Sequence, residues 1–488
     1  MEELEITEKP LKFKSRKELN KEKILKNKNI FLTMLILLIP LAINNVIKSL
    51  HDMIDALLVA KAYSADEALK NSAIAALDIH WPTFGVFIAL GTGLSFAIVG
   101  MVGQYVGAKK MDLAKKYASK FIFISVALGL ILTLIFFLTS NVVWGKNIIA
   151  YLMGARGETL NFANGYFFIR GFEFVFVFFF MSYVAIRQAT GETVLPVILN
   201  ISAVISNIVL TYILVIIFNF GPNGAAIATV ISQIMICPIA LIDLFKSKKG
   251  ITISVKDLIP SQKEFVEIAK IAVPASLGAM VSQLGFGVIK GITLSYGDHV
   301  STAFSAGNRI SSFLTNFLNA ITQVMALFIS INIGNKNEKR AKRSYLLGTI
   351  LSFSSMVFFC IIVIPLRIPI IKMILSVDDS SSVLKLSATY AVWLIGTQPL
   401  MGLFQSYCGL FNGSANSKYS LMMELFRLWI FRIPFLVFYV LVIDRSLKNP
   451  MGIAYIMMAS NILIIIVGEI LKRKVNYEVK VKLGNSLA

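Results

Sequence analysis

The chain alternates long apolar runs with short polar segments along most of its length. An α-helix needs about 20 apolar residues to cross the ~30 Å hydrocarbon core of a bilayer. Runs of that length predict twelve membrane-spanning helices, near residues 30–58, 73–103, 117–140, 161–184, 194–218, 223–245, 265–295, 300–332, 344–366, 384–409, 419–443 and 450–471. The pattern therefore predicts an all-α polytopic membrane protein.

The composition favours the same class. Hydrophobic residues make up 56% of the 488 positions and charged residues only 15%, whereas an ordinary soluble domain is about 25% charged. Residues 1–29 are polar and basic and contain no apolar stretch typical of a signal peptide. We therefore expect the first apolar run to remain in the protein as a spanning helix.

The polar segments alternate in charge. Basic clusters occupy the N-terminus and residues 108–116, 245–250, 334–343 and 471–480, and the segments between them are neutral or weakly charged. Because Lys and Arg are retained in cytoplasmic loops, we expect both termini in the cytoplasm and the chain in the cell (inner) membrane. The same clusters account for the net charge of +20, so nucleic-acid binding is not predicted.

The two halves of the chain repeat each other. Segment 102–116 aligns with 331–343 at an offset of 227 residues, and 220–232 aligns with 448–460 at an offset of 228. An offset that spans six apolar runs leaves both halves in the same orientation, a plan found in transporters. We predict a basic N-terminal segment, two six-helix lobes joined by a cytoplasmic loop, and a cytoplasmic tail, at residues 1–29, 30–245, 246–263, 264–471 and 472–488.

The first apolar run carries charged residues in its second half. His51 and Asp55 lie one helical turn apart and share a helix face. An ionisable residue inside a membrane costs about 2.5–3.5 kcal/mol on insertion scales and is usually paired or functional. Asp55 is therefore a candidate proton or cation site, and the alternative is a charge near the outer helix end that is only paired or capping.

Two further charges stand inside apolar runs. Glu173 follows Arg170 by three residues, which predicts either an internal ion pair or a cavity carboxylate that attracts cationic substrates. Lys290 interrupts the seventh run. It is expected to pair with an acid across the cavity, to contact an anionic group of a substrate, or to reach the membrane surface with its long side chain.

Several segments taken together resemble the MATE (multidrug and toxic compound extrusion) family. They are the stretch from Pro40 to Asp55 with its continuation IDALLVA, the turn GQYVGA, the loop AIRQATGETVLP, the run GAAIATVIS and the RIP at Arg432 to Pro434. The resemblance covers about residues 30–470. It implies a V-shaped pair of six-helix lobes that exports cationic or amphipathic compounds in exchange for H⁺ or Na⁺.

The resemblance also implies an ion site. In the prokaryotic DinF-like branch, a first-helix Asp lies 15 residues after a Pro proposed as a hinge, and Asp55 follows Pro40 at that spacing. The implied partners are Asn207, Thr211 and Thr229, with Thr211 standing where the branch has a second Asp. Carboxylate, amide and hydroxyl oxygens suit Na⁺, so a bound Na⁺ at Asp55 and a carried H⁺ both stay open.

Two other positions depart from the family. His51 stands where some members have Tyr, and because imidazole titrates near neutrality it favours H⁺ slightly. Ser282 stands where the NorM-like branch has a Glu in the seventh helix, so a coupling carboxylate of that type is absent from the C-lobe. We count Ser282 with Glu173 and Lys290 as candidate cavity residues.

Two functions other than drug transport are a flippase and a membrane enzyme. A lipid or oligosaccharide flippase of the same superfamily would use a cationic cavity, and Lys290, Arg427 and Arg432 favour it. A membrane enzyme is not favoured, because the three His and three Cys show no metal spacing and no GxSxG turn occurs. We expect small-molecule substrates, a lipid bilayer and no cofactor beyond the coupling ion, and we expect a monomer.

Overall fold

The computed structural model describes residues 24, 29–246, 250–375, 382–444 and 449–481. These residues form helices and connecting segments, with no strand among them. Most of the predicted basic segment 1–29 and the end of the predicted tail, 482–488, lie outside the described residues.

The first half of the chain contains helices of very different length. They are α2 (Ile30–Ala62), α3 (Glu67–Gly107), α4 (Met111–Leu138), α5 (Asn141–Trp144), α6 (Ile148–Leu152), α7 (Gly157–Gly171), α8 (Glu173–Ala189), α9 (Val194–Thr211), the π-helical η1 (Tyr212–Ile217), α10 (Gly221–Lys246) and the 3₁₀ turn η2 (Val255–Asp257).

The second half follows the same plan. Its helices are α11 (Gln262–Ser295), α12 (Asp298–Gly334), α13 (Glu338–Val363), α14 (Arg367–Leu375), α15 (Ser382–Gly396), α16 (Gln398–Gly413), α17 (Ser417–Glu424), η3 (Leu425–Arg432), α18 (Ile433–Phe438), η4 (Tyr439–Ile443) and α19 (Gly452–Arg473).

Polar caps start several of the long helices. The Asn29 side chain accepts a hydrogen bond from the Leu32 backbone N–H at the start of α2, and Asp66 does the same for Leu69 at the start of α3. Ser261 and Glu264 form a reciprocal capping box at the start of α11. Such caps satisfy backbone N–H groups that have no partner inside the helix.

The predicted all-α membrane architecture is confirmed. By length and composition, nine helical segments of the described residues are long and apolar enough to cross a membrane. The pair α7 and α8, bent by 44°, makes a tenth span. Two shorter apolar helical stretches are Ile30–Asn45 of α2 and Ser382–Gly396, which is α15. With them, the segments overlap the twelve predicted runs in order.

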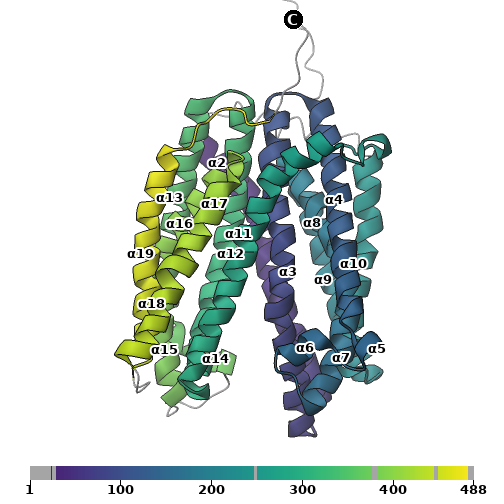
Figure 1. Cartoon of the computed structure of the whole chain (residues 1–488), viewed down its shortest axis with the longest axis vertical. Helices are drawn as coiled ribbons and strands as arrows, with labels where there is room; N and C mark the ends of the chain where they lie inside the picture. The colour runs from purple at the N-terminus through teal and green to yellow at the C-terminus, as the bar shows by residue number, and fades with distance from the viewer. Residues whose placement is uncertain (1–23, 25–28, 247–249, 376–381, 445–448, 482–488) are drawn as a thin grey trace, which may run out of the picture.

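The helices gather into two halves (Figure 1). Helices α3 to α10 lie on one side of the molecule and α12 to α19 on the other. The first helix of each half crosses between them: α2 contacts α12 and α13 as well as α9 and α10, and α11 contacts both α3 and α17. The lobe boundaries named from the sequence stay a prediction.

An ionic cluster ties the start of α11 to the other half. The Glu264 carboxylate pairs with Lys116 Nζ at 2.8 Å and with Lys120 Nζ at 3.2 Å, and both lysines belong to α4. The Lys120 side chain is only 3% exposed. Nearby, Tyr117 Oη donates a hydrogen bond to Glu267 Oε2 at 2.6 Å. The amino end of α11 is therefore anchored on the N-terminal half.

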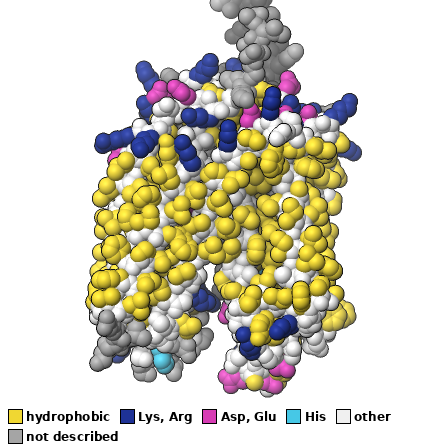
Figure 2. All heavy atoms as spheres, in the orientation of Figure 1, with side chains coloured by type: hydrophobic (Ala, Val, Ile, Leu, Met, Phe, Trp, Pro, Cys, Tyr) yellow, Lys and Arg dark blue, Asp and Glu magenta, His cyan; other side chains and the backbone are white. Residues whose placement is uncertain are grey.

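The surface divides into an apolar belt and two different ends (Figure 2). Hydrophobic side chains cover the outside of both halves, and Lys and Arg side chains gather at the end from which the C-terminal segment emerges. At the opposite end a notch separates the halves. We name these the basic end and the notched end. Exposed apolar side chains such as Leu130, Ile131 and Leu134 of α4 are typical of contact with lipid.

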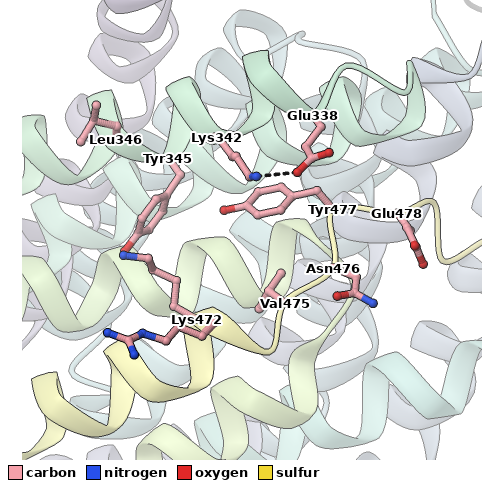
Figure 3. A pocket seen from close by; sticks show the side chains of 10 residues that line it. Glu338, Lys342, Tyr345, Leu346, Lys472, Val475, Asn476, Tyr477 and Glu478 are labelled. Carbon is pink, nitrogen blue, oxygen red and sulfur yellow. Dashed lines mark ion pairs between the residues drawn. The ribbon is translucent and has the colours of Figure 1, made fainter.

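The chain after α19 folds back over the basic end. Val475 and Val481 are buried, and the Lys480 backbone N–H donates a hydrogen bond to Gln104 Oε1 of α3 at 3.0 Å. Figure 3 shows a cavity of about 570 Å³ beside this segment, where the Tyr477 ring lies next to Lys342. Its charged lining is mixed in sign and lies outside the predicted ion site.

Candidate functional site

Asp55 lies in α2 and its carboxylate is buried. The residue is 7% exposed, and Asp55 Oδ1 accepts a hydrogen bond from Thr211 Oγ1 at 2.9 Å. Thr211 is the last residue of α9 and is fully buried. The structure thus brings together two residues that lie 156 positions apart in the chain.

The polar contacts continue from Thr211 to a third helix. Asn207 lies one turn before Thr211, and its Oδ1 is 3.5 Å from Thr211 Oγ1. Asn207 Nδ2 donates to Thr229 Oγ1 of α10 at 3.1 Å, and Thr229 Oγ1 donates to the Ala225 carbonyl at 2.9 Å. We call Asp55, Thr211, Asn207 and Thr229 the α2–α9–α10 polar cluster.

All four members of this cluster were predicted from the sequence. Asn207, Thr211 and Thr229 are at most 2% exposed, so the cluster is a continuous line of polar groups inside the N-terminal half. His51 lies in the helical backbone of α2, but its side chain is outside the described side chains.

A tight turn brings α10 against α9. Helix α9 passes into the π-helical η1 immediately after Thr211, and Asn219 and Gly221 then adopt positive φ angles of 56° and 55°. A Cβ on Gly221 would lie 2.2 Å from Tyr63 Oη, so only glycine fits both the angle and the space. π-Helical turns are frequently found next to functional sites.

The chemistry of the cluster suits a small hard cation or a proton. One carboxylate, one amide and two hydroxyl groups provide the oxygen atoms that Na⁺ prefers, and a buried carboxylate can itself take a proton. Among the described residues, no three His, Cys, Asp or Glu side chains gather to hold a metal ion. Asp55 is the acid of the four-residue cluster.

The second half does not copy this cluster. Thr229 and Ser232 correspond to Met457 and Ser460 at the offset of 228. There, the fully buried Arg432 donates from Nε to Ser460 Oγ at 2.8 Å and from Nη2 to the Met457 carbonyl at 3.3 Å. A guanidinium thus lies against the repeat counterparts of Thr229 and Ser232, and its positive charge disfavours a second cation there.

Pro40 lies within α2 and interrupts its backbone hydrogen bonding without ending the helix. Proline lacks the N–H that would bond four residues back, which permits bending. Asp55 is 15 residues further along, about 22 Å at the rise of an α-helix. A bend at Pro40 would therefore move Asp55 relative to the amino end of α2.

Glu173 lies in an ion pair inside the N-terminal half. Its Oε2 is 3.0 Å from Arg170 Nη1, and the two side chains are 7% and 10% exposed. The Arg170 guanidinium also lies over the Phe84 ring at 5.0 Å. The structure thus places Glu173 in a buried internal ion pair, one of the two arrangements that its spacing predicted.

Ser282 lies beside a second buried arginine. Its Oγ is 3.3 Å from Arg427 Nη2, which also contacts Glu424 Oε2 at 2.6 Å. Arg427 is 2% exposed and its guanidinium lies 4.5 Å from the centre of the Phe404 ring. Where the related branch carries an acid, this chain therefore presents a hydroxyl to a guanidinium.

Lys290 of α11 is exposed and lies seven residues after Gln283, so the helical period puts both on the same side of α11. Nearer the basic end, α3 and α11 are in contact: a Cβ on Gly85 of α3 would lie 3.2 Å from Gln283 Nε2 of α11. Asp78 of α3 is exposed as well and lies seven residues before Gly85, with Pro82 of the same helix between them. Figure 2 shows basic and acidic side chains on opposite walls of the notch.

Sequence reasoning missed Asp78. The signal was available, because Asp78 is the single acid in the apolar stretch SAIAALDIHW, and intramembrane acids are site candidates. The packing of α3 against α11, which brings the helices of Asp78 and Lys290 together, does not show in the sequence.

Comparisons with known proteins add to this geometry. A MatE family model matches residues 40–213 and 274–438 of the chain. Multidrug export protein MepA of Staphylococcus saprophyticus is 29% identical over 241 residues, which cover 49% of this chain and 52% of that protein. The alignment thus spans about half of the length of this relative.

Two other matches cover most of the chain. The probable multidrug resistance protein YoeA of Bacillus subtilis is 22% identical over 413 residues, 83% of this chain and 86% of that protein. An outward-facing structure of a multidrug resistance MATE family transporter of the MOP superfamily aligns with a TM-score of 0.79 at 20% identity, covering 93% of this chain and 95% of that one. The latter likeness shows the fold.

Proposed function

This chain belongs to the MatE family, and from that premise we propose that it is a secondary antiporter that exports cationic or amphipathic compounds in exchange for H⁺ or Na⁺. The observation that supports this proposal most is the α2–α9–α10 polar cluster. A buried carboxylate with three polar partners on two other helices is a costly arrangement inside a membrane, and ion coupling explains why it is present.

The transport cycle would alternate between two openings of the molecule. The basic end lies in the cytoplasm, because Lys and Arg are retained there, and the notch opens to the outside. In this outward-open form Asp55 takes up the external ion, which favours release of the exported compound and return to an inward-open form. Loading of a new substrate from the cytoplasm reverses the bias.

The driving force is adequate for this task. A membrane potential of 100 mV supplies about 2.3 kcal/mol for each charge that moves across, which corresponds to roughly 50-fold accumulation. Among the described residues, the repeat counterparts of Thr229 and Ser232 contact Arg432 and not an acid. One coupling site per chain is therefore expected, and a single copy of the chain contains every part of it.

Replacing Asp55 tests the proposal. Asp55→Asn keeps the size of the side chain and can still accept the hydrogen bond from Thr211, but it removes the ionisable group. We expect the variant to insert and fold normally and to lose ion-coupled efflux of cationic dyes from proteoliposomes under separate H⁺ and Na⁺ gradients. Wild-type efflux by a folded Asp55→Asn variant would contradict the proposal.

A second candidate is a flippase for lipids or oligosaccharides. The exposed Lys290 of α11 supports it, because acidic head groups and sugar acids need a cationic partner. Arg427 and Arg432 support it less, since both are buried inside the C-terminal half and hydrogen-bonded there. Dye efflux in cells that lack their main pump separates the two functions, because a flippase would leave it unchanged.

A further inference from the structure

The two halves approach each other very closely at the basic end, where α3 meets α12. A Cβ on Gly107 would lie 2.0 Å from the Ile331 carbonyl oxygen, and a Cβ on Gly334 would lie 2.0 Å from the Gln104 carbonyl oxygen. Carbon and oxygen atoms of separate residues do not approach so closely, so the two backbones meet only because both positions are glycine.

This contact is related to itself by the internal repeat. The offset of 227 converts Gly107 into Gly334 and Gln104 into Ile331. Gly107 packs against Ile331 and Gly334 packs against Gln104, and these two partners are themselves repeat-related. Such a reciprocal contact is the intramolecular form of the interface in a twofold dimer, in which the same patch serves both partners.

Two more contacts extend the closed region. A Cβ on Gly100 would lie 2.4 Å from the Asn412 carbonyl oxygen of the other half. The C-terminal segment crosses over the same place, as Figure 1 shows for the yellow chain that leaves α19, and its Lys480 N–H donates to Gln104 Oε1. The halves are thus in backbone contact at the basic end and separated by the notch at the other.

We propose that Gly107 and Gly334 form the inner gate of the transporter, a backbone contact that closes the cytoplasmic side in the outward-open form and separates in the inward-open form. This inference rests on the proposed alternating-access transport. The gate stabilises the outward-open form because the two surfaces fit without side chains. Any side chain at either glycine favours the form in which α3 and α12 have moved apart.

Single alanine substitutions test the gate. In Gly334→Ala and Gly107→Ala, the added methyl group must move at least about 1 Å away from the facing carbonyl oxygen. Overpacking of this kind shifts an equilibrium roughly 5- to 150-fold. Because the contact is reciprocal, the two variants should shift it in the same direction and to a similar extent.

The readout is a distance across the basic end. Lys109 and Lys336 are exposed, repeat-related loop residues on the two halves. Spin labels at Lys109→Cys and Lys336→Cys report the separation of the halves in lipid nanodiscs, without substrate. We expect both alanine variants to increase the population with the longer distance at least about 5-fold.

Two glycines provide matched controls. A Cβ on Gly287 of α11 would meet no atom within 4 Å, whereas a Cβ on Gly402 of α16 would lie 2.9 Å from the Ser352 carbonyl oxygen inside the C-terminal half. Gly287→Ala should leave both the distance and the thermal stability unchanged. Gly402→Ala should lower the thermal stability without changing the distance.

The outcomes test the proposed gate and the proposed antiport function separately. An unchanged distance in folded Gly107→Ala or Gly334→Ala overturns the gate, and so does an equal shift in Gly287→Ala. The measurement needs neither ion nor substrate. If the distance shifts as expected while the wild-type protein exports no dye under any gradient, the gate stands and the proposed antiport function fails.

Discussion

Thr211 connects the acid of the polar cluster to the rest of it. Its hydroxyl donates to Asp55 Oδ1 at 2.9 Å and lies 3.5 Å from Asn207 Oδ1. The same oxygen can stabilise a negative carboxylate by donating its hydrogen or can bind a cation with a lone pair. Its removal therefore has opposite consequences for the two candidate ions.

Thr211→Val removes the hydroxyl and keeps the shape of the side chain. If the coupling ion is H⁺, the negative form of Asp55 loses a hydrogen bond, and the midpoint of pH-dependent efflux moves to higher pH by about one to two units. If the ion is Na⁺, a ligand is lost and the half-maximal Na⁺ concentration rises by roughly 10- to 100-fold. Efflux titrations against pH and against Na⁺ distinguish these results.

Thr211→Ser is the control, because it retains the hydroxyl and loses only a methyl group. It should respond to both ions as the wild-type protein does. A valine variant with wild-type titrations would show that Thr211 has no part in coupling.

The residues of the cluster could be predicted only in part from physical reasoning. The cost of a charge in an apolar run singled out Asp55, and the spacing of Asn207 and Thr211 puts them on one helix face. The meeting of α2 with α9 and α10 came from the family resemblance alone, because nothing in a single sequence measures a contact 156 residues apart.

At the scale of elements, α3 is the helix that takes part in both ends of the molecule. At the basic end Gly107 packs on α12, and toward the notched end the exposed Asp78 lies two helical turns from Gly85, on the face of α3 that contacts α11. When the outer side closes, α3 and α11 should approach along this face, and the opposite charges of Asp78 and Lys290 then meet.

Reversing these charges tests that approach. Asp78→Lys alone and Lys290→Asp alone each put like charges face to face, which opposes closure of the outer side, so we expect efflux to slow several-fold at low ionic strength. The double variant Asp78→Lys with Lys290→Asp restores an attractive pair and should recover most of the rate. Additive losses in the double variant would show that the residues do not meet.

The spans themselves were predictable, but their bends were not. Hydropathy located each apolar run because the bilayer sets a minimum length. The 44° bend between α7 and α8 and the π-helical turn after Thr211 leave no comparable trace. They depend on which neighbouring helices replace the lost backbone hydrogen bonds, and that is a property of the packed structure.

At the scale of the whole molecule, two copies of one six-helix plan surround a central space. The repeat was visible in the sequence from two aligned segments, and one of them contains Gly107 and Gly334, which the backbone contact at the basic end requires. The notch was not visible there, because the sequence is the same whichever side is open.

The orientation in the membrane can be measured with single cysteines. Leu152, 76% exposed beside the notched end, should label as Leu152→Cys with a membrane-impermeant maleimide on intact cells. Lys336→Cys, at the basic end, should label only after the membrane is permeabilised, because basic loops remain in the cytoplasm. The reverse pattern would place the termini outside.

The anchoring of α11 on α4 has a consequence for biosynthesis. Lys120 is buried against Glu264, and these residues lie in different halves of the chain. At translation rates of roughly 5–20 residues per second, the lysine waits on the order of ten seconds for its partner to leave the ribosome. The first six spans therefore enter the bilayer as an unfinished subassembly, and the emergence of the seventh completes it.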